Sequence, residues 1–190
     1  PLILTTFAVP AYWMGYKKKH EEALEAAKKV IVETENEYAG RFGRSYGGLF
    51  QAYRCEDAEA VILTMGSLAR TTKAVVDRFR ELGFRLGLVK LKTFRPFPGA
   101  ELKPLLEKMK VVGVLERNYS VGGCGGAVFS ELRSALYNLE DGPLILDFIA
   151  GMGGQDITPS EIEAVAKKTV KVAQAERVER ETEWLLGGIA

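Results

Sequence analysis

Cysteine and histidine are scarce in this chain, which has two cysteines, Cys55 and Cys124, and one histidine, His20, among its 190 residues. The cysteines lie far apart and neither belongs to a CxxC pair, which excludes a disulfide framework, a zinc ribbon and an iron–sulfur cluster held by this chain alone. A single histidine inside the lysine run 17–20 gives no support to a Ser-His-Asp triad. The low cysteine content fits a reducing cytoplasm, where we expect the protein.

Long apolar runs and an excess of one charge are also missing. No run approaches the roughly 20 apolar residues that cross a bilayer, and no signal peptide is recognisable, so we expect no membrane partner. The formal net charge of +1 does not mark a nucleic-acid binder. The length favours one domain plus an appendage. Because the sequence begins with Pro1 and not Met, we expect it to be a piece of a longer polypeptide.

Strand and helix patterns alternate through most of the chain. Four continuous apolar runs predict buried strands at residues 60–65, 85–91, 111–115 and 144–149. Helical periodicity predicts helices at residues 68–82, 101–109 and 127–139 and after Pro159. This alternation predicts an α/β fold, a three-layer α/β/α sandwich around a mostly parallel five-stranded sheet, with residues 49–54 as an antiparallel edge strand.

Local signals place the ends of several helices. Ser67 is a natural N-cap, Gly83 a C-terminal cap, and residues 158–161 (TPSE) form a capping box. A further helix is predicted at residues 20–38, after an irregular stretch that Pro10 interrupts. We therefore expect three parts: residues 1–48 (a helix plus a turn), residues 49–172 (the α/β domain) and residues 173–190 (a charged helical tail).

A glycine-rich turn, residues 116–126 (ERNYSVGGCGG), follows the third apolar run. Its glycines stand where a Rossmann loop would stand, but the GxGxxG spacing is broken by Val128, and Asp147 is a poor candidate for the ribose-binding acid. Three interpretations stay open: a dinucleotide site, a tight packing turn, and a loop that contacts a ligand or a subunit. Glycine serves all three, since it permits positive φ and close backbone approach. Cys124 lies near a helix start, where a thiolate would be stabilised, with Arg117 as a possible basic partner.

Two charged residues are predicted at the carboxyl edge of the sheet. Arg95, in the stiff turn Arg95-Pro96-Phe97-Pro98, can bind a carboxylate or a phosphate bidentately, either in a salt bridge within or between subunits or on a substrate. Glu116 ends a buried strand at the edge where such sheets bind ligands. The alternative for Glu116 is a salt bridge with Arg95 or Arg117.

Four segments together resemble one family. They are residues 60–67 (AVILTMGS), residues 86–98 (LGLVKLKTFRPFP), residues 114–118 followed by Ser120 and the glycines, and residues 148–158 (FIAGMGGQDIT). These segments resemble the α subunit of pyruvate:ferredoxin oxidoreductase and related 2-oxoacid:ferredoxin oxidoreductases, in the domain that has the fold of the transketolase C-terminal domain. The resemblance covers about residues 49–169. Residues 1–40 look like the tail of a preceding domain, the one that binds the thiamine pyrimidine ring.

The resemblance implies a function for the whole enzyme, which oxidatively decarboxylates pyruvate to acetyl-CoA and reduces ferredoxin. It implies thiamine diphosphate, [4Fe-4S] clusters and coenzyme A in that enzyme, none of them held by this chain alone. The partners would be thiamine-binding and iron–sulfur-binding subunits or domains, and ferredoxin. This chain would be a scaffold at a subunit interface, inactive in isolation.

No catalytic or metal-binding residue can be transferred from the family to this sequence. The weak cofactor-binding candidates that match family motifs are Arg95, Asn118, Gly122, Gly123, Gly125 and Gly126, and Asp156 matches a motif as well. Three rival functions stay open: a stand-alone nucleotide- or CoA-binding module built on the glycine turns and Arg95, a purely structural interaction domain, and a transketolase-like domain of another thiamine enzyme. The pocket that selects the oxoacid is expected elsewhere.

Overall fold

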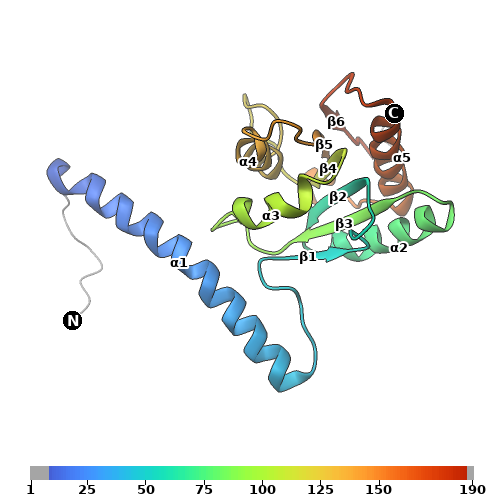
Figure 1. The fold of residues 1–190 in the computed structure, drawn as a ribbon. Helices are drawn as coiled ribbons and strands as arrows, with labels where there is room; N and C mark the ends of the chain where they lie inside the picture. Colours follow the sequence, from blue (N-terminus) through green and yellow to red (C-terminus); the bar gives the residue numbers. More distant parts are fainter. Residues whose placement is uncertain (1–8, 188–190) are drawn as a thin grey trace. The chain divides into compact units, whose positions relative to one another are not determined.

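The computed structural model describes residues 9–187, in which the chain divides into two compact units with the boundary after Gly48 (Figure 1). The first unit contains helix α1 (Pro10–Phe42), which is longer than the helix predicted from the sequence. Pro10 does not interrupt a segment; it occupies the first turn of α1, where its missing N–H would have no intrahelical partner. Gly43 ends α1 in the left-handed conformation, with φ of 65°.

The second unit is built on one six-stranded sheet with the strand order β1-β3-β2-β4-β5-β6. Only the pair of β1 and β3 is antiparallel, and the other four pairs are parallel. The strands are β1 (Phe50–Tyr53), β2 (Ala60–Met65), β3 (Leu86–Leu91), β4 (Val111–Glu116), β5 (Leu144–Ile149) and β6 (Thr182–Trp184). The predicted α/β sandwich, its four parallel strands and its antiparallel edge strand are confirmed.

The predicted count of five strands and the predicted helical tail are wrong. Helix α5 (Pro159–Ala175) ends where Glu176 adopts a left-handed conformation, with φ of 51°. The chain then returns to the sheet, and β6 pairs with β5 through the bonds from Asp147 N to Glu181 O and from Leu185 N to Ile149 O, both 2.8 Å. A three-residue strand flanked by charged residues has no apolar run of its own, so it resembles a solvated tail in the sequence.

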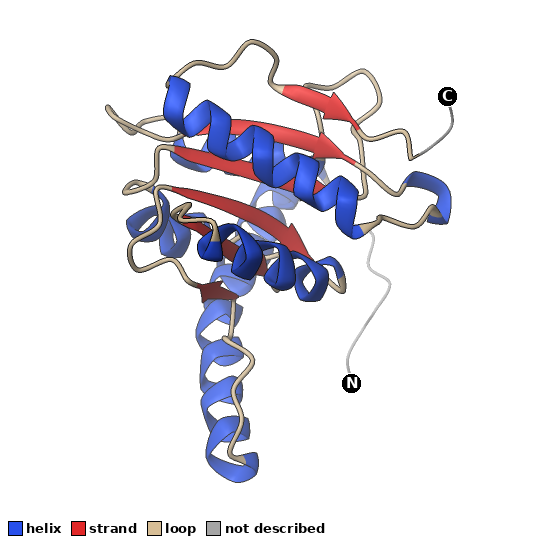
Figure 2. Cartoon of the chain, turned by 90° about the vertical axis from the view of Figure 1, so that its right-hand side faces the viewer, coloured by secondary structure: helices blue, strands red, loops and turns tan. Residues whose placement is uncertain are grey.

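Helices cover both faces of the sheet (Figure 2). Helices α2 (Leu68–Glu81) and α5 pack on one face, and α3 (Gly99–Leu106) and α4 (Ala127–Leu136) pack on the other. Each face has its own core, with Phe79 and Phe148 in one and Leu102 and Phe129 in the other. Burial on both faces explains why the strands are continuous apolar runs.

Two of the three predicted helix ends are confirmed. Thr158 and Glu161 form the capping box, with Pro159 in the first turn. Gly83 has φ of 87° just after α2, and the bond from Phe84 N to Phe79 O closes the turn. Ser67 is not an N-cap, because it has helical dihedral angles and its side chain makes no capping hydrogen bond.

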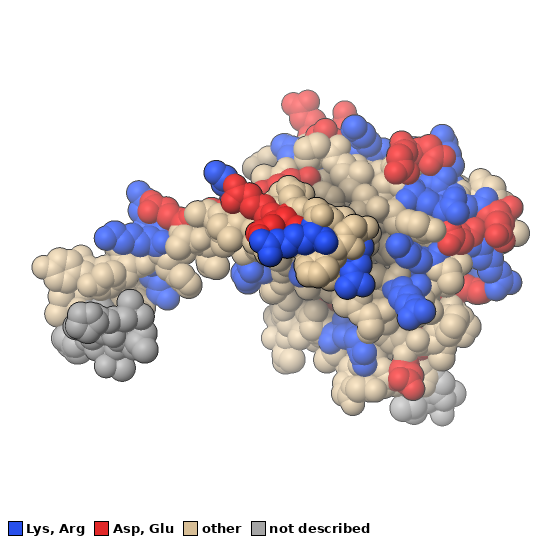
Figure 3. Space-filling model, turned by 90° about the horizontal axis from the view of Figure 1, so that it is seen from below, with Lys and Arg blue, Asp and Glu red and all other residues tan. Residues whose placement is uncertain are grey.

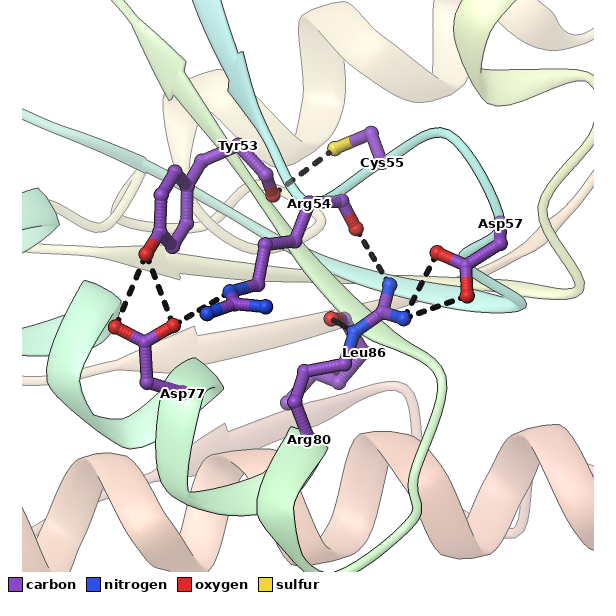
Figure 4. Close-up of polar contacts among 7 residues, drawn as sticks. All are labelled: Tyr53, Arg54, Cys55, Asp57, Asp77, Arg80 and Leu86. Atoms are coloured by element: carbon purple, nitrogen blue, oxygen red, sulfur yellow. Dashed lines mark hydrogen bonds and ion pairs between the residues drawn. The ribbon is translucent and has the colours of Figure 1, made fainter.

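The antiparallel edge is fastened to α2 by two hydrogen-bond clusters (Figure 4). Asp77 accepts hydrogen bonds from the Tyr53 hydroxyl at 2.9 and 3.0 Å and from Arg54 Nε at 2.5 Å. Arg80 donates to Asp57 and to two backbone oxygens, those of Arg54 and Leu86. These contacts bind β1 and its following turn to a helix.

Acidic and basic side chains are intermingled on the α/β unit, as the face drawn in Figure 3 shows. Among the described residues, no helix is both long enough and apolar enough to span a membrane.

Candidate functional site

The sheet reverses its direction of growth between β2 and β4. From β2 the chain crosses through α2 to β3 on one side, and from β4 it crosses through α4 to β5 on the other side. Because α2 and α4 lie on opposite faces, a crevice opens at the carboxyl ends of β2 and β4, the usual ligand position in such sheets. A cleft of ≈ 320 Å³ lies there, lined by Thr64, Met65, Gly66, Leu68, Leu115, Glu116, Arg117, Asn118 and Val128.

The glycine turn delivers the chain from this crevice into α4, and its backbone donors are already occupied. The first four N–H groups of a helix lack intrahelical partners, but in α4 side chains of β4, β5 and the turn accept all four. The bonds run from Gly126 N to Asp147 Oδ2 (3.0 Å), from Ala127 N to Asn118 Oδ1 (2.7 Å), and from Val128 N and Phe129 N to Glu116 Oε2 and Oε1 (2.9 Å each).

This saturation decides what the turn can bind. A helix N-terminus holds a phosphate through free N–H groups, and α4 has none to offer. Two carboxylates of the protein occupy the position that a pyrophosphate takes in a dinucleotide-binding turn. The geometry therefore favours the packing-turn interpretation and argues against a nucleotide site on α4.

Close packing against these carboxylates explains two of the four glycines. A Cβ on Gly126 would lie 2.2 Å from Glu116 Cδ. A Cβ on Gly125, whose φ is 108°, would lie 2.5 Å from Asp147 Oδ2. Gly122 and Gly123 are exposed instead; Gly122 has φ of 74° and open space around it. The turn therefore has a buried half that supports α4 and an exposed half.

Glu116 and Asp147 are both removed from solvent, with exposed fractions of 5% and 0%. Burial, together with the neighbouring Glu116 charge, raises the pKa of Asp147 to about 7. Its Oδ1 has no hydrogen-bond partner in the part of the chain that the structure describes. Asp147 is therefore a buried acid that exchanges its proton near neutral pH.

The predicted salt bridge of Glu116 with Arg95 or Arg117 is wrong. Glu116 accepts a hydrogen bond from Asn118 Nδ2 at 2.5 Å, besides the two bonds from α4. Arg117 donates to Gly151 O and Gln155 O, on either side of the short 3₁₀ helix η1 (Met152–Gly154). A carboxylate that ends a buried strand, followed by glycines at a helix start, is the sequence signal that could have identified this cap.

The structure brings some of the candidate residues together and leaves others apart. Asn118 and Gly126 meet around Glu116, and Gly125 packs against Asp147. Arg95 is exposed, pairs with Glu131 of α4 and stacks on the Phe94 ring, which is the intradomain salt bridge among its alternatives. The remaining candidates, Cys124 and Asp156, are exposed.

The polar side chains that line the crevice between β2 and β4 are engaged in hydrogen bonds within the domain. The Thr64 hydroxyl donates to Leu115 O at 2.7 Å, and the polar atoms of Glu116 and Asn118 are engaged with α4. Within residues 9–187, no three His, Cys, Asp or Glu side chains are grouped to hold a metal ion. His20 lies on α1, in the other unit. No nucleophile–base pair is therefore formed at this cleft by the described residues.

Comparison with known proteins gives matches over most of the chain. The family model described as pyruvate:ferredoxin oxidoreductase core domain II matches residues 58–162. The pyruvate synthase subunit PorA of Pyrococcus horikoshii is 40% identical over 185 residues, which are 97% of this chain and 46% of that protein. The ketoisovalerate oxidoreductase subunit VorA of the same organism is 39% identical over 184 residues, again 97% and 46%.

The chain thus spans about half the length of the curated relatives that it matches. Among solved structures, a 2-oxoglutarate:ferredoxin oxidoreductase from Magnetococcus marinus is 20% identical, with a TM-score of 0.48 over 70% of this chain and 21% of that chain.

Proposed function

Because this chain belongs to the family of pyruvate:ferredoxin oxidoreductase core domain II, we propose that it is part of a 2-oxoacid:ferredoxin oxidoreductase. The whole enzyme oxidatively decarboxylates pyruvate to acetyl-CoA and passes the electrons to ferredoxin. The observation that carries this proposal is the 40% identity to a pyruvate synthase subunit over 97% of the chain, centred on the matched domain.

Within that enzyme, the chain acts as a scaffold at a subunit interface. The internal caps of α4 support this role, because the side chains of Glu116, Asp147 and Asn118 are used in hydrogen bonds that hold the turn in place. The exposed half of the glycine turn adds a surface for contact, with the Val121 side chain 96% exposed at its tip.

The enzyme's cofactors belong to other domains or subunits. Cys55 is buried and Cys124 is exposed, and no metal-binding cluster exists in residues 9–187, so a [4Fe-4S] cluster does not fit this chain. The saturated N-terminus of α4 does not fit the pyrophosphate of thiamine diphosphate. We assign thiamine diphosphate, the clusters and coenzyme A to thiamine-binding and iron–sulfur-binding partners, with ferredoxin as the electron acceptor and the cytoplasm as the location.

Two oxoacids are candidate substrates, because a relative named for pyruvate is 40% identical to this chain and one named for ketoisovalerate is 39% identical. Pyruvate is the proposed substrate, and ketoisovalerate, with its branched chain, is the second candidate.

Affinity purification of the tagged chain from its native host, followed by activity assays, tests the proposal. We expect thiamine-binding and iron–sulfur subunits to co-purify, and the assembly to reduce a viologen dye when pyruvate and coenzyme A are both present. Ketoisovalerate in the same assay tests the second candidate. The purified chain alone serves as the control and should be inactive. Purification of the tagged chain without partners, or pyruvate-dependent dye reduction by the chain alone, would contradict the proposal.

A further inference from the structure

A second cleft, of ≈ 160 Å³, lies where the N-terminal part of α2 crosses the antiparallel edge of the sheet. Its lining residues come from β1, β3 and α2: Gln51, Tyr53, Ala69, Arg70, Lys73, Leu88 and Lys90. Three of these residues are cations and none is an acid. We call this feature the basic cleft.

The fold itself brings the polar groups of the basic cleft together. Gln51 and Lys90 are directly paired across β1 and β3, as are Tyr53 and Leu88. Because alternate residues of a strand share a face, all four lie on the α2 side of the sheet, where Leu88 packs in the core shared with α2 and α5. Gln51, Lys73 and Lys90 are half-buried, so the cleft is recessed, whereas Arg70 is exposed at its rim.

No ion pair within the described part of the chain neutralises the positive charge of the basic cleft. Arg70, Lys73 and Lys90 form no ion pair with any residue between 9 and 187. Asp77, one turn beyond Lys73 on α2, is already held by Tyr53 and Arg54, as Figure 4 shows. The Lys73 ammonium instead lies 4.4 Å from the centroid of the Tyr53 ring, which orients it without removing its charge.

This arrangement opposes the ordinary electrostatics of a helix. Arg70 and Lys73 lie in the first two turns of α2, and the first turn contains no acid. Cations near a helix N-terminus are unfavourable, because the aligned peptide dipoles already place positive charge there. Like charges gathered in a small cleft repel one another as well. Both terms become favourable when an anion occupies the cleft.

We propose that the basic cleft binds a phosphoryl anion carried by a small molecule. The volume suits a phosphate or a pyrophosphate group. A guanidinium can bind phosphate oxygens in bidentate fashion, and two ammonium groups add charge from the walls. The Gln51 amide adds a neutral donor. This inference does not depend on the proposed oxidoreductase function, because it rests on the contacts of β1, β3 and α2 alone.

The test is an NMR titration of the full 190-residue chain with inorganic phosphate, pyrophosphate and adenosine monophosphate. We expect saturable shifts of the amide resonances at residues 51, 69–73 and 90, with pyrophosphate at least 10-fold tighter than phosphate. Tighter binding of the nucleotide than of inorganic phosphate would assign the anion to a nucleotide-like ligand, and equal binding would assign it to the free anion. Both results support the site.

Paired variants make the assignment specific. The double variant Arg70→Gln/Lys73→Gln should weaken pyrophosphate binding at least 10-fold. The matched control, Lys167→Gln/Lys171→Gln, removes two exposed lysines of α5 outside the basic cleft and should leave binding unchanged. At low salt without anion, the first variant should melt at the same or a higher temperature than the wild type, which separates lost binding from lost folding.

Three results would overturn the proposal. They are equal losses of affinity in the two double variants, shifts spread over lysines of the whole surface, and shifts of the same amides by a hexaglutamate peptide with none by phosphate or pyrophosphate. The last result would make the basic cleft a contact for an acidic protein segment.

Discussion

The Glu116 carboxylate leaves no room for a side chain at Gly126. A methyl group there would overlap the carboxylate of Glu116, and a buried carboxylate that moves loses two N–H partners. We expect Gly126→Ala to lower the free energy of unfolding by about 3 kcal/mol, from overpacking and the lost hydrogen bonds. Gly122→Ala meets open space and strains only a positive φ, so it should cost about 1 kcal/mol. Urea unfolding of both variants checks this, and equal midpoints would show that the close approach does not exist.

Asp147 makes stability depend on pH in a direction opposite to that of a salt-bridged acid. The native carboxyl keeps its proton until about pH 7, whereas an unfolded Asp loses it near pH 4. Unfolding therefore releases a proton between these values. The stabilisation is complete below about pH 4 and is lost as pH rises through about 7, at up to about 1.4 kcal/mol per pH unit.

Asp147→Asn should remove this dependence, because the amide stays neutral and its oxygen still accepts from Gly126 N. The measurement is urea unfolding between pH 5 and 8, where the variant should lose less stability than the wild type. Asp141→Asn, at an exposed position, is the control and should follow the wild-type curve. Parallel curves for wild type and Asp147→Asn would show that Asp147 is ionised in the native protein throughout this range.

Two helices illustrate opposite ways of starting an element. Helix α5 is capped by its own Thr158 and Glu161, whereas α4 borrows its caps from β4, β5 and the glycine turn. Thr158→Ala should therefore cost about 1 kcal/mol, the usual value for a local cap. Glu116→Ala should cost about 3 kcal/mol, because it leaves buried N–H groups of α4 without acceptors.

Hydrogen exchange distinguishes these two capping mechanisms. In Glu116→Ala, the amides of Val128 and Phe129 should lose protection, and the pairing of β2 with β3 should keep it. In Thr158→Ala, the change should stay within the first turn of α5. Loss of protection across the whole sheet in Glu116→Ala would mean that the carboxylate holds the sheet and not the helix.

Elements whose signal lies within a few residues could be predicted from the sequence. The buried parallel strands are unbroken apolar runs, and the Thr158 box is written in four residues. Strand β6 could not be predicted, since its pairing with β5 depends on where α5 ends. The α4 partners of Glu116 and Asp147 were also hidden, because residues 12 to 21 positions apart meet only after the sheet forms. Ser67 has a favourable residue type but makes no cap, because its backbone is already helical, which the residue type does not reveal.

At the scale of the whole molecule, the scaffold proposal assigns an outer contact to the glycine turn. The Val121 side chain is 96% exposed at the tip of the turn, so a partner that packs on the turn would cover it. We expect Val121→Asp to leave the melting temperature of the chain within about 1 °C of wild type, since surface substitutions rarely change stability. In the assembly, a buried unpaired charge should reduce subunit co-purification at least 10-fold.

Leu82→Asp is the comparison variant. Leu82 is 65% exposed at the opposite edge of the sheet, just after α2. It should affect co-purification little if the partner sits on the glycine turn. An equal loss for both variants, or none for Val121→Asp, would remove the turn from the interface.

The anion-binding position at the start of α4 is occupied by side chains of the protein itself. In many α/β proteins the corresponding N–H groups are free and bind a dissociable anionic ligand, so that the protein can respond to ligand binding and release. Here the Glu116 and Asp147 side chains, which cannot dissociate, take the place of such a ligand. To bind a nucleotide at this turn, both side chains would have to be replaced, and the space that Gly125 and Gly126 leave for them would have to be reshaped. The start of α4 therefore keeps a fixed shape without a bound ligand, which suits the scaffold role proposed for this chain.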